Sequence, residues 1–383
     1  MQSVKIKVGI FIDWYLPAFK AGGPIQSIAN LVDRLKDELD LYIITSNNDL
    51  GEIMDLQQLN TWIDKDGCHI IYLDPAHQNI GFYKKLLRQN SFDVVYFNSM
   101  FSIKFTLLPL WVLRNHPVKK VLATRGMLAK GALAIKPIKK KLFLKLFKQM
   151  GFHKKVDWHA TSQSEAEEIK THFGQERTII LAPNLPSLHR LEIGEKQKKV
   201  DEIRIFFLSR IAVKKNLLAA LDMLSATKPC YKIAFTIIGP VDDKHYWEKC
   251  QSRMQNMSDN IKVNYIGAIP NHELSGHIRD EHLLLLPTYG ENFGHVIVES
   301  WQYGCPVIIS DQTPWHNLEA LKLGYDIALE DRDAFIKAIE HFAAMDGKTY
   351  RVWSNSALEH AKKFTENPEI INQTRSLFLL TTP

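Results

Sequence analysis

The stretch Leu283–Glu319, LLLLPTYGENFGHVIVESWQYGCPVIISDQTPWHNLE, decides the fold of this chain. Four leucines that end at Pro287 predict a short buried strand. The loop Tyr289–Gly294 comes next, and a helix is predicted from about His295 to Tyr303, stopped by the glycine that follows it. Pro306–Ser310 is rich in β-branched residues and predicts a second buried strand. Strand, glycine-bearing loop, helix and strand form a βαβ unit of a parallel sheet.

Two glutamates make this loop a candidate binding site. Ligands of parallel α/β sheets bind beyond the carboxyl ends of the strands, where helix N-termini also attract anions. Glu291 lies in the loop and Glu299 about one turn further into the helix, eight residues later. Carboxylates are strong acceptors for hydroxyl donors. The spacing therefore suits a ligand that carries several hydroxyl groups along its length.

The loop resembles the E-x7-E motif of retaining, nucleotide-sugar-dependent glycosyltransferases with the GT-B fold. Their large family 4, glycosyl transferases group 1, includes many bacterial polysaccharide and lipopolysaccharide enzymes. Glu291 and Glu299 match the two glutamates, and Gly290–Gly294 matches the G-E-x-F-G around the first. The alternative is an ordinary βα turn whose glutamate is favoured by the helix dipole. That alternative does not predict the matches that follow.

A basic turn earlier in the chain strengthens the resemblance. Ile203–Ser209 is a predicted strand, and Leu217–Ala226 a predicted helix. Between them Arg210 and Lys215 can both point at one anionic group. This turn resembles the S-R-x-x-x-x-K-N/G motif by which the family holds the donor diphosphate. A basic turn at a strand end is common by itself, but its position ahead of Glu291 favours the functional interpretation.

The N-terminal region has a glycine loop of its own. Val4–Ile12 is a predicted strand, Ile25–Leu39 a predicted helix, and Gly22 and Gly23 lie in the loop between them. Paired glycines allow the backbone to approach a ligand closely. The loop is not G-x-G-x-x-G, which disfavours an NAD oxidoreductase. It resembles the family's first loop, which covers the donor diphosphate and sugar; a plain βα loop is the alternative.

Arg125 stands where the family often carries a histidine. It follows the predicted strand Val121–Thr124. In related enzymes that histidine faces the reacting sugar, and its role cannot be carried over to an arginine. Contact with an acceptor phosphate, contact with the donor and a plain surface cation all stay open for Arg125.

Positive charge is concentrated in one region. Residues 118–155 carry twelve Lys or Arg and no Asp or Glu, so the rest of the chain nets −6 (6 minus 12). Within this region Pro137–Gly151 predicts a basic helix with an apolar stripe made of Ile138, Leu142, Leu146 and Met150, widened by Phe143 and Phe147. Such a helix can lie on an anionic membrane surface. It can equally turn the stripe to the core and its lysines to solvent.

Composition indicates a soluble protein with two domains. The chain has 383 residues, which is long for one core, and is 45% hydrophobic and 23% charged. Four cysteines without C-x-x-C spacing favour reduced thiols and disfavour a zinc site. There is no signal-peptide pattern and no apolar run near the roughly 18 residues of a membrane-spanning helix. We expect a cytoplasmic protein, with peripheral attachment to the inner face of the cytoplasmic membrane as a further hypothesis.

The alternation of strands and helices predicts an α/β protein with two Rossmann-like domains whose parallel sheets face each other across a cleft. Residues 1–185 form the acceptor-side domain, residues 186–201 a polar linker, and residues 202–365 the nucleotide-sugar domain. Residues 366–383 form a helix that returns to the first domain, as the resemblance implies. Asp331-Arg332-Asp333 has the D-x-D pattern of a metal motif but precedes an amphipathic helix, so we interpret it as a helix N-cap and predict no metal.

The resemblance implies a retaining hexosyltransferase. Arg210, Lys215 and the amides of Gly22 and Gly23 would stabilise the leaving diphosphate without a metal. Glu291 would contact hydroxyls of the sugar, and Glu299 those of the ribose. The backbone of Asn292, Phe293 and Gly294 would hold the sugar. The donor is a substrate, expected to be a UDP- or GDP-sugar, and no further cofactor is implied.

The acceptor implied is a glycan or a lipid-linked glycan, and not a nucleic acid. Two other functions stay open: a sugar-nucleotide 2-epimerase with the same fold, which needs no acceptor, and a non-catalytic subunit that only binds a sugar nucleotide. Intact Glu291, Glu299, Arg210 and Lys215 disfavour the second.

Overall fold

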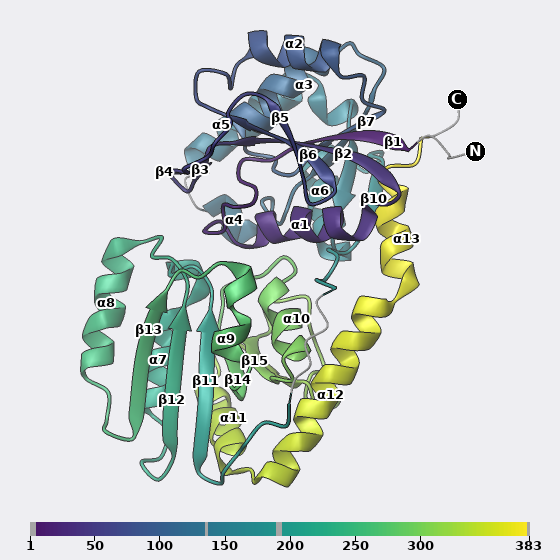
Figure 1. The fold of residues 1–383 in the computed structure, drawn as a ribbon. Coiled ribbons are helices and arrows are strands. Elements are labelled where there is room, and N and C mark those ends of the chain that lie inside the picture. Colours follow the sequence, from purple (N-terminus) through teal and green to yellow (C-terminus); the bar gives the residue numbers. More distant parts are fainter. Residues whose placement is uncertain (1–4, 135–136, 189–193, 381–383) are drawn as a thin grey trace. The chain divides into compact units, whose positions relative to one another are not determined.

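The structure is a computed structural model that describes residues 5–134, 137–188 and 194–380 (Figure 1). The chain divides into two compact units. The first unit consists of residues 1–188 and 367–383, and the second of residues 189–366. Each unit contains one large sheet with helices packed against it, as expected for two α/β domains.

The first unit is built on an eight-stranded sheet. Its strands are ordered β10-β9-β8-β7-β1-β2-β6-β5, and the described pairs are parallel except for β5 with β6. The strands are β1 Ile6–Phe11, β2 Leu39–Ser46, β5 Trp62–Lys65, β6 Cys68–Leu73, β7 Val94–Phe97, β8 Lys119–Ala123, β9 Asp157–Ala160 and β10 Ile179–Leu181, with a small hairpin of β3 Asn48–Asp49 and β4 Glu52–Ile53. The helices are α1 Gly23–Leu35, α2 Ile80–Gln89, α3 Leu108–Leu113, α4 Lys130–Ala134, α5 Pro137–Gln149, α6 Gln163–Phe173 and α13 Pro368–Ser376.

The strand order of the first unit reverses between β1 and β7. From β1 the chain adds β2 and β6 on one side, and it then returns to place β7 on the other. At such a switch point the loops that follow the two adjacent strands run in opposite directions and leave a crevice, where α/β sheets bind ligands. The loop before α1, the loop after β7 and the loop after β8 therefore define the candidate ligand edge of this unit.

The second unit has a fully parallel sheet of six strands, ordered β13-β12-β11-β14-β15-β16. The strands are β11 Glu202–Leu208, β12 Lys232–Ile238, β13 Ile261–Gly267, β14 Leu283–Leu286, β15 Val307–Ser310 and β16 Gly324–Ile327. The helices are α7 Leu217–Ser225, α8 Lys244–Gln255, α9 Ser275–Ile278, α10 His295–Gln302, α11 Arg332–Ala344 and α12 Gly347–Glu366. Here the switch point lies between β11 and β14.

The central βαβ unit forms where the sequence predicts it. The four leucines of β14 are completely buried, which accounts for the absence of any polar residue in the strand. Helix α10 starts at His295 as predicted and ends at Gln302, one residue early. Gly304 follows with φ 64°, a left-handed conformation that suits glycine at the end of a helix. Buried Val307–Ser310 then returns as β15.

The region predicted as a linker is only partly described, because residues 189–193 lie outside the described residues. The following segment belongs to the second unit. There the Lys198 ammonium donates hydrogen bonds of 2.9 Å to the carbonyls of Ala343 and Met345. Burial lowers the pKa of Lys198 to about 8. This part of the chain is therefore fixed to α11 of its own unit.

The C-terminal segment contacts the first unit. Arg375 on α13 forms an ion pair with Glu38, with 2.7 Å between the Nε and Oε2 atoms. Phe378 is buried and lies 6.0 Å from the ring of Tyr96. The carbonyl of Leu379 accepts a hydrogen bond of 2.6 Å from Lys119. The last helix is thus part of the first unit although it follows the second in the sequence.

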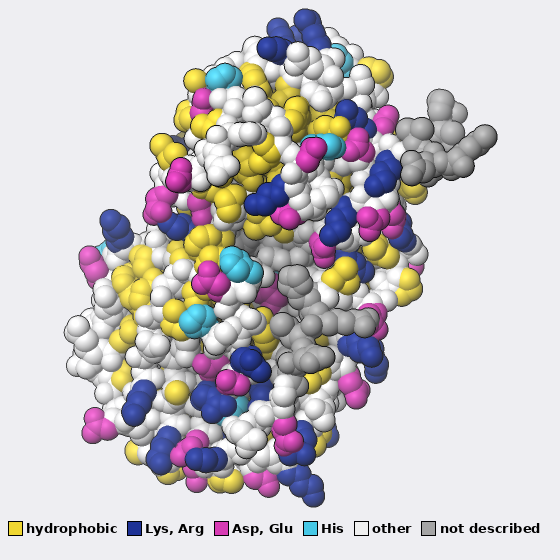
Figure 2. Space-filling model, viewed as in Figure 1, with side chains coloured by type: hydrophobic (Ala, Val, Ile, Leu, Met, Phe, Trp, Pro, Cys, Tyr) yellow, Lys and Arg dark blue, Asp and Glu magenta, His cyan; other side chains and the backbone are white. Residues whose placement is uncertain are grey.

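Charge on the second unit is mixed. On the face shown in Figure 2, Lys and Arg side chains alternate with Asp and Glu side chains over this unit. No single-sign patch is visible on this face of the second unit.

Candidate functional site

The loops after β11, β14 and β15 are tied together at the switch point of the second sheet. The amide of Tyr289 donates to the carbonyl of Lys214 at 2.8 Å, and the Thr288 hydroxyl donates to the same carbonyl at 3.1 Å. The amide of Glu291 donates to the carbonyl of Gln312 at 3.0 Å. These bonds fix the first residues of the Tyr289–Gly294 loop beside the turn that contains Lys215.

Lys215 and Glu291, predicted to share a site, form an ion pair. The side chains keep only 16% and 12% of their surface exposed. They come from the two loops that flank the switch point, 76 residues apart in the sequence. A pair this shielded from water is costly to break from one side, because the remaining charge loses its partner. The structure therefore places a cation and a carboxylate together at the carboxyl edge of the sheet.

Arg210 lies in a different pair. Its Nη1 atom donates to Asp242 at 2.8 Å, and the two side chains are 38% and 40% exposed. The sequence predicts that Arg210 and Lys215 can point at one anion, but in the structure each is held by its own carboxylate. The more exposed pair is the weaker one, because water screens it. Arg210 can exchange Asp242 for a ligand at smaller cost than Lys215 can exchange Glu291.

Glu299 lies on α10, and hydrogen bonds compensate little of the cost of burying its carboxyl group. Burial raises the pKa of its carboxyl to about 7, against a small lowering by a hydrogen bond from Asn271. That bond is long, 3.4 Å between Nδ2 and Oε1. The side chain still keeps some exposed surface. A desolvated carboxyl with a single weak donor has spare acceptor capacity for the hydroxyl groups of a ligand.

Phe293 and Gly294, in the loop that follows Glu291, are held by packing. Phe293 is 6% exposed and packs edge-on against Trp315, with ring centroids 5.6 Å apart. The indole Nε1 of Trp315 donates to the Phe293 carbonyl at 2.6 Å. Gly294 has φ 76°, and a Cβ there would lie 2.7 Å from Cδ1 of Ile297. Asn292 is partly exposed. The Phe293 carbonyl is thus already engaged within the protein, and the predicted contact of Asn292, Phe293 and Gly294 with a sugar stays a prediction.

Gly22 and Gly23 lie in the first unit, at the amino end of α1. Gly22 has φ 66° and is the N-cap, and Pro24 occupies the first turn. This conformation matches the close backbone approach predicted for the pair. Their position across a cleft from Glu291 stays a prediction.

No metal cluster is found among the described residues: no group of three or more His, Cys, Asp or Glu there is placed to hold an ion. The D-x-D sequence has the predicted structural role. Asp331 is the N-cap of α11, and its Oδ1 accepts a hydrogen bond of 3.0 Å from the amide of Ala334.

The apolar stripe of α5 faces outward. Ile138 is 81% exposed, and Leu142 and Leu146 are 57% and 44% exposed, whereas Phe147 is completely buried. The aliphatic stripe therefore does not face the core, whereas Phe143 and Phe147, which widen it, make the core contact. In the described part of the chain no helix is long and apolar enough to cross a membrane.

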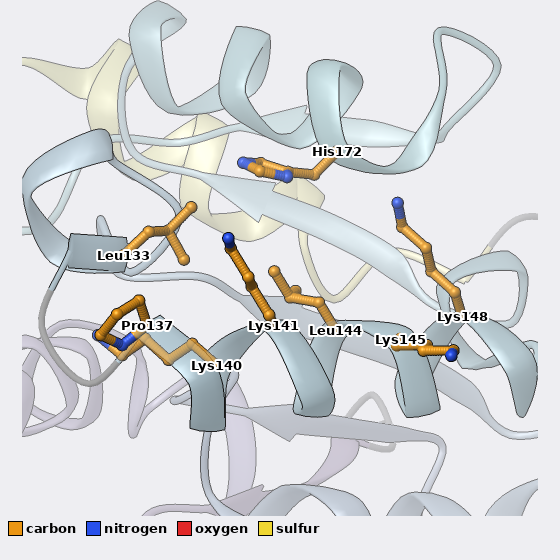
Figure 3. A pocket seen from close by; sticks show the side chains of 8 residues that line it. All are labelled: Leu133, Pro137, Lys140, Lys141, Leu144, Lys145, Lys148 and His172. Carbon is orange, nitrogen blue, oxygen red and sulfur yellow. The ribbon is translucent and has the colours of Figure 1, made fainter.

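A cavity of about 450 Å³ lies beside the stripe (Figure 3). In this view Lys141, Leu144 and Lys148 on α5 point toward the helix that carries His172. The lining combines apolar and cationic side chains: Leu133, Pro137, Lys140, Lys141, Leu144, Lys145, Lys148 and His172. One side of the exposed stripe is thus bordered by lysines.

Sequence reasoning missed the partners of the predicted residues. Asp242 pairs with Arg210, Asn271 donates to Glu299, and Trp315 holds the Phe293 carbonyl. None of them belongs to a recognisable motif. Their only signal is position, because each follows a strand of the second sheet and so reaches the same edge.

Comparison with known proteins agrees with this geometry. Residues 190–360 match the family Glycosyl transferases group 1. The second unit is a glycosyl transferases group 1 domain. The Lys215–Glu291 pair and Glu299 all lie within the matched residues.

Solved structures show that the whole chain has the GT-B fold, as predicted. It is similar to a sucrose-phosphate synthase from Thermosynechococcus elongatus, with a TM-score of 0.73 and 15% identity over 98% of both chains. It is also similar to WaaG, a glycosyltransferase involved in lipopolysaccharide biosynthesis, with a TM-score of 0.70 and 12% identity over 98% of this chain and 100% of that one. HepE of Anabaena, solved with UDP-glucose, is similar with a TM-score of 0.67 and 12% identity over 97% of this chain and 98% of that one.

One curated relative is an uncharacterized 41.2 kDa protein in the cps region of Klebsiella pneumoniae. It is 26% identical over 358 residues, which cover 90% of this chain and 92% of that protein. This similarity extends over both units, whereas the family match is confined to the second.

Proposed function

We propose that this protein is a glycosyltransferase that moves a hexose from a nucleotide sugar to a hydroxyl of a glycan or lipid-linked glycan. The observation that carries the proposal is the shielded Lys215–Glu291 pair at the switch point of a glycosyl transferases group 1 domain. It supplies a cation for a diphosphate and a carboxylate for sugar hydroxyls on adjacent loops. The donor proposed is a UDP- or GDP-sugar; the UDP-glucose bound by HepE makes that sugar the first to test.

Each residue has a distinct role in this proposal. Lys215 and the more exposed Arg210 bind the diphosphate and stabilise the negative charge that grows as the glycosidic bond breaks. The positive amino end of the α10 dipole adds to this stabilisation. Glu291 accepts hydrogen bonds from sugar hydroxyls, and Glu299 accepts them from the ribose. Gly23 contributes a backbone amide from the first unit, whereas the amide of Gly22 already donates to the carbonyl of Phe19 at 3.0 Å.

We further propose retention of anomeric configuration and no requirement for a metal. The acceptor oxygen bonds to the anomeric carbon on the face that the diphosphate leaves, and its proton passes to the departing phosphate oxygen. No enzyme nucleophile is needed for this path. Product anomer analysis by NMR and activity in a chelator test these two statements independently.

The first experiment is a thermal-unfolding panel with UDP-, GDP-, ADP- and dTDP-sugars, because a ligand that binds only the native state raises its stability. Incubation with the binding donor alone, followed by product analysis, comes next. An epimerised nucleotide sugar would identify a 2-epimerase instead. Donor binding without transfer to any glycan acceptor would identify a non-catalytic binding protein.

We also propose that α5 contacts an anionic membrane surface. The stripe of Ile138, Leu142, Leu146 and Met150 is exposed, and Lys141, Lys145 and Lys148 border it. Apolar side chains inserted at the interface and lysines over anionic headgroups stabilise binding together. A surface of this kind would bring the enzyme to lipid-linked acceptors.

Vesicle co-sedimentation tests the membrane contact. The protein should bind vesicles containing phosphatidylglycerol and not pure phosphatidylcholine vesicles. Replacing Leu142 and Leu146 by serine should reduce binding roughly tenfold, since two partly inserted leucines are lost. Leu321→Ser, at a leucine 52% exposed in the second unit, is the matched control and should bind like wild type. Equal binding by all three proteins would contradict the proposal.

A further inference from the structure

Arg125 is held by three side chains of the first unit. It follows β8, and its Nε and Nη2 atoms donate hydrogen bonds of 2.8 Å to Oδ1 of Asn98 and to the hydroxyl of Tyr96. Its Nη1 atom donates to Oδ1 of Asn184. All three acceptors are neutral. Within the described ranges no ion pair joins Arg125 to a carboxylate, so the guanidinium is fixed in place by neutral groups alone.

Hydrogen bonds link Arg125, Tyr96, His159 and the carbonyl of Ala182, and in each of them the donor and the acceptor can be assigned. Nε2 of His159 lies 2.7 Å from the carbonyl of Ala182, and a carbonyl can only accept, so Nε2 carries the proton. Nδ1 must then accept from the Tyr96 hydroxyl at 2.8 Å. The Tyr96 oxygen is left to accept from Arg125. Burial, together with the charge of Arg125, lowers the pKa of His159 to about 4, which keeps the imidazole neutral and the chain intact near pH 7.

Glu165, a buried carboxylate that contacts both neighbours of Arg125, is already satisfied. Glu165 accepts 2.8 Å hydrogen bonds from the amide and hydroxyl of Thr161, one of 2.6 Å from the amide of Gly126, and one from Thr124. Burial raises the pKa of Glu165, but these bonds outweigh burial and hold the pKa below its ordinary value. Glu165 thus anchors the turn that carries Arg125 without pairing with its guanidinium.

The turn itself is strained. Arg125 has φ 53°, a left-handed conformation that costs a residue with a side chain about 1 kcal/mol. The hydrogen bonds of Glu165 to both sides of the turn hold this conformation. Strain of this kind is retained where a side chain must be aimed.

Arg125 is aimed at the switch point of the first sheet. Asn98, which follows β7, accepts from Arg125 and also donates at 3.1 Å from its Nδ2 atom to the carbonyl of Pro24. The guanidinium therefore lies one side chain away from the Gly22–Pro24 loop. Three of its five N–H groups are used, and the residue keeps some exposed surface. With respect to the described residues, two N–H donors are therefore left for a ligand.

We propose that Arg125 is a binding residue for a phosphate group of a substrate at the carboxyl edge of the first sheet. Two N–H donors in one plane match the geometry of a phosphate, and no described carboxylate forms an ion pair with the guanidinium. The inference deepens the proposed function and rests on it for the identity of the substrate. The phosphate belongs either to the donor diphosphate or to a phosphorylated acceptor, such as a lipid-linked one.

The test is phosphate binding by the full chain. Binding is measured as the rise of the thermal-unfolding midpoint with inorganic phosphate concentration at constant ionic strength. Arg125→Gln should weaken binding roughly tenfold or more, the loss expected for a charge-assisted contact. Arg125→Lys should recover part of the affinity because it keeps the charge. Arg114→Gln is the matched control: Arg114 stacks on Trp111 before the amino end of β8 and should have no effect.

Repeating the titration in saturating UDP identifies the source of the phosphate. If UDP removes the Arg125-dependent binding, the site takes the donor diphosphate; if that binding persists, it takes an acceptor phosphate. Either result supports the proposal. Phosphate binding that is undetectable in wild type, or equal in wild type, Arg125→Gln and Arg114→Gln, overturns it. Failure of the proposed function has a separate signature, since no nucleotide sugar would then bind while the Arg125-dependent phosphate binding persists.

Discussion

Lys215 in the second unit and Arg125 in the first occupy similar positions and are held in opposite ways. Each follows a strand at the carboxyl edge of a largely parallel sheet, beside the switch point. Lys215 is paired with Glu291, and both side chains are mostly buried. Arg125 is held by three neutral oxygen atoms. An anion that binds Lys215 must compete with Glu291 for the ammonium group. An anion that binds Arg125 competes only with neutral acceptors.

The carboxyl groups of the two units show the same contrast. Glu165 receives four hydrogen bonds, and its pKa is held down; Glu299 receives one long bond, and burial raises its pKa to about 7. The first is satisfied by the protein and stabilises it. The second is left with unused acceptor capacity, at a cost in stability, as expected for a group that completes its hydrogen bonds with a ligand.

The largest effect is expected from Lys215→Ala. Removing the ammonium leaves Glu291 shielded and unpaired, which should lower the free energy of unfolding by about 3 kcal/mol. Transfer should fall at least tenfold, because a charge-assisted contact to the diphosphate is lost. Urea unfolding and initial rates with the matching donor measure the two effects. Wild-type turnover in a folded variant would remove Lys215 from the site.

The double variant Lys215→Ala with Glu291→Gln separates stability from function. It should recover most of the lost stability, because no unpaired charge is left. Activity should not recover, since neither the cation nor the carboxylate is present. Recovery of both would mean that the pair only supports the fold.

The next largest effect concerns Glu299. A carboxyl whose folded pKa is raised favours the folded state at low pH and loses that contribution as pH rises through about 7. Glu299→Gln imitates the neutral form, so at pH 8 it should be about 2 to 3 kcal/mol more stable than wild type without ligand. The advantage should vanish near pH 4. Nucleotide-sugar affinity should nevertheless fall, which urea titrations with and without donor would show.

Glu165→Gln is the control of opposite sign. The pKa of Glu165 is lowered in the folded state. Its contribution to stability is therefore present above the pKa of the unfolded state and is lost as the pH falls through the folded pKa. This variant should be less stable than wild type at pH 7. If both glutamine variants change stability in the same direction, the contrast between the two carboxyl groups is wrong.

Tyr96→Phe should have a smaller effect on the Arg125 site. It removes the hydroxyl between Arg125 and His159 without changing any charge, and we expect a loss of about 1 to 2 kcal/mol of stability. Phosphate affinity should fall severalfold, because the guanidinium is then held by two side chains instead of three. Tyr72→Phe also removes a buried hydroxyl in this unit, one bonded to Leu16, and should reduce stability alone. Equal phosphate affinities in the two variants would show that Tyr96 does not position Arg125.

The smallest effect is expected from Asp242→Asn. The Arg210–Asp242 pair is more than one third exposed, so stability should change by less than about 1 kcal/mol. Nucleotide affinity should rise about twofold, because Arg210 no longer shares its charge. Calorimetric titration with the nucleoside diphosphate measures this. A marked loss of affinity would instead give Asp242 a direct part in binding.

Local sequence pattern was sufficient for the central βαβ unit. The apolar run 283–286, the glycines and the β-branched run before Ser310 each determine structure over a few residues, and β14, α10 and β15 follow them closely. The Asp331 cap was predictable for the same reason.

Long-range pairing was not predictable in this way. The bonds of Arg210 to Asp242 and of Arg125 to Asn184 join residues 32 and 59 positions apart and depend on how the strands are ordered. The direction of α5 was also undecided by pattern, because both its leucine stripe and its phenylalanines are apolar. Packing of Phe147 in the core left the stripe exposed.

The most direct test of the site is calorimetric binding of the nucleotide sugar that most raises the unfolding midpoint, compared with its free nucleoside diphosphate. Glu299→Gln should weaken both ligands by a similar factor, because ribose is common to them. Glu291→Gln should lower the affinity for the nucleotide sugar relative to the affinity for the diphosphate, because only the sugar contacts that carboxylate. Wild-type affinities for both ligands in both variants would contradict the assignment of the donor site to these two glutamates.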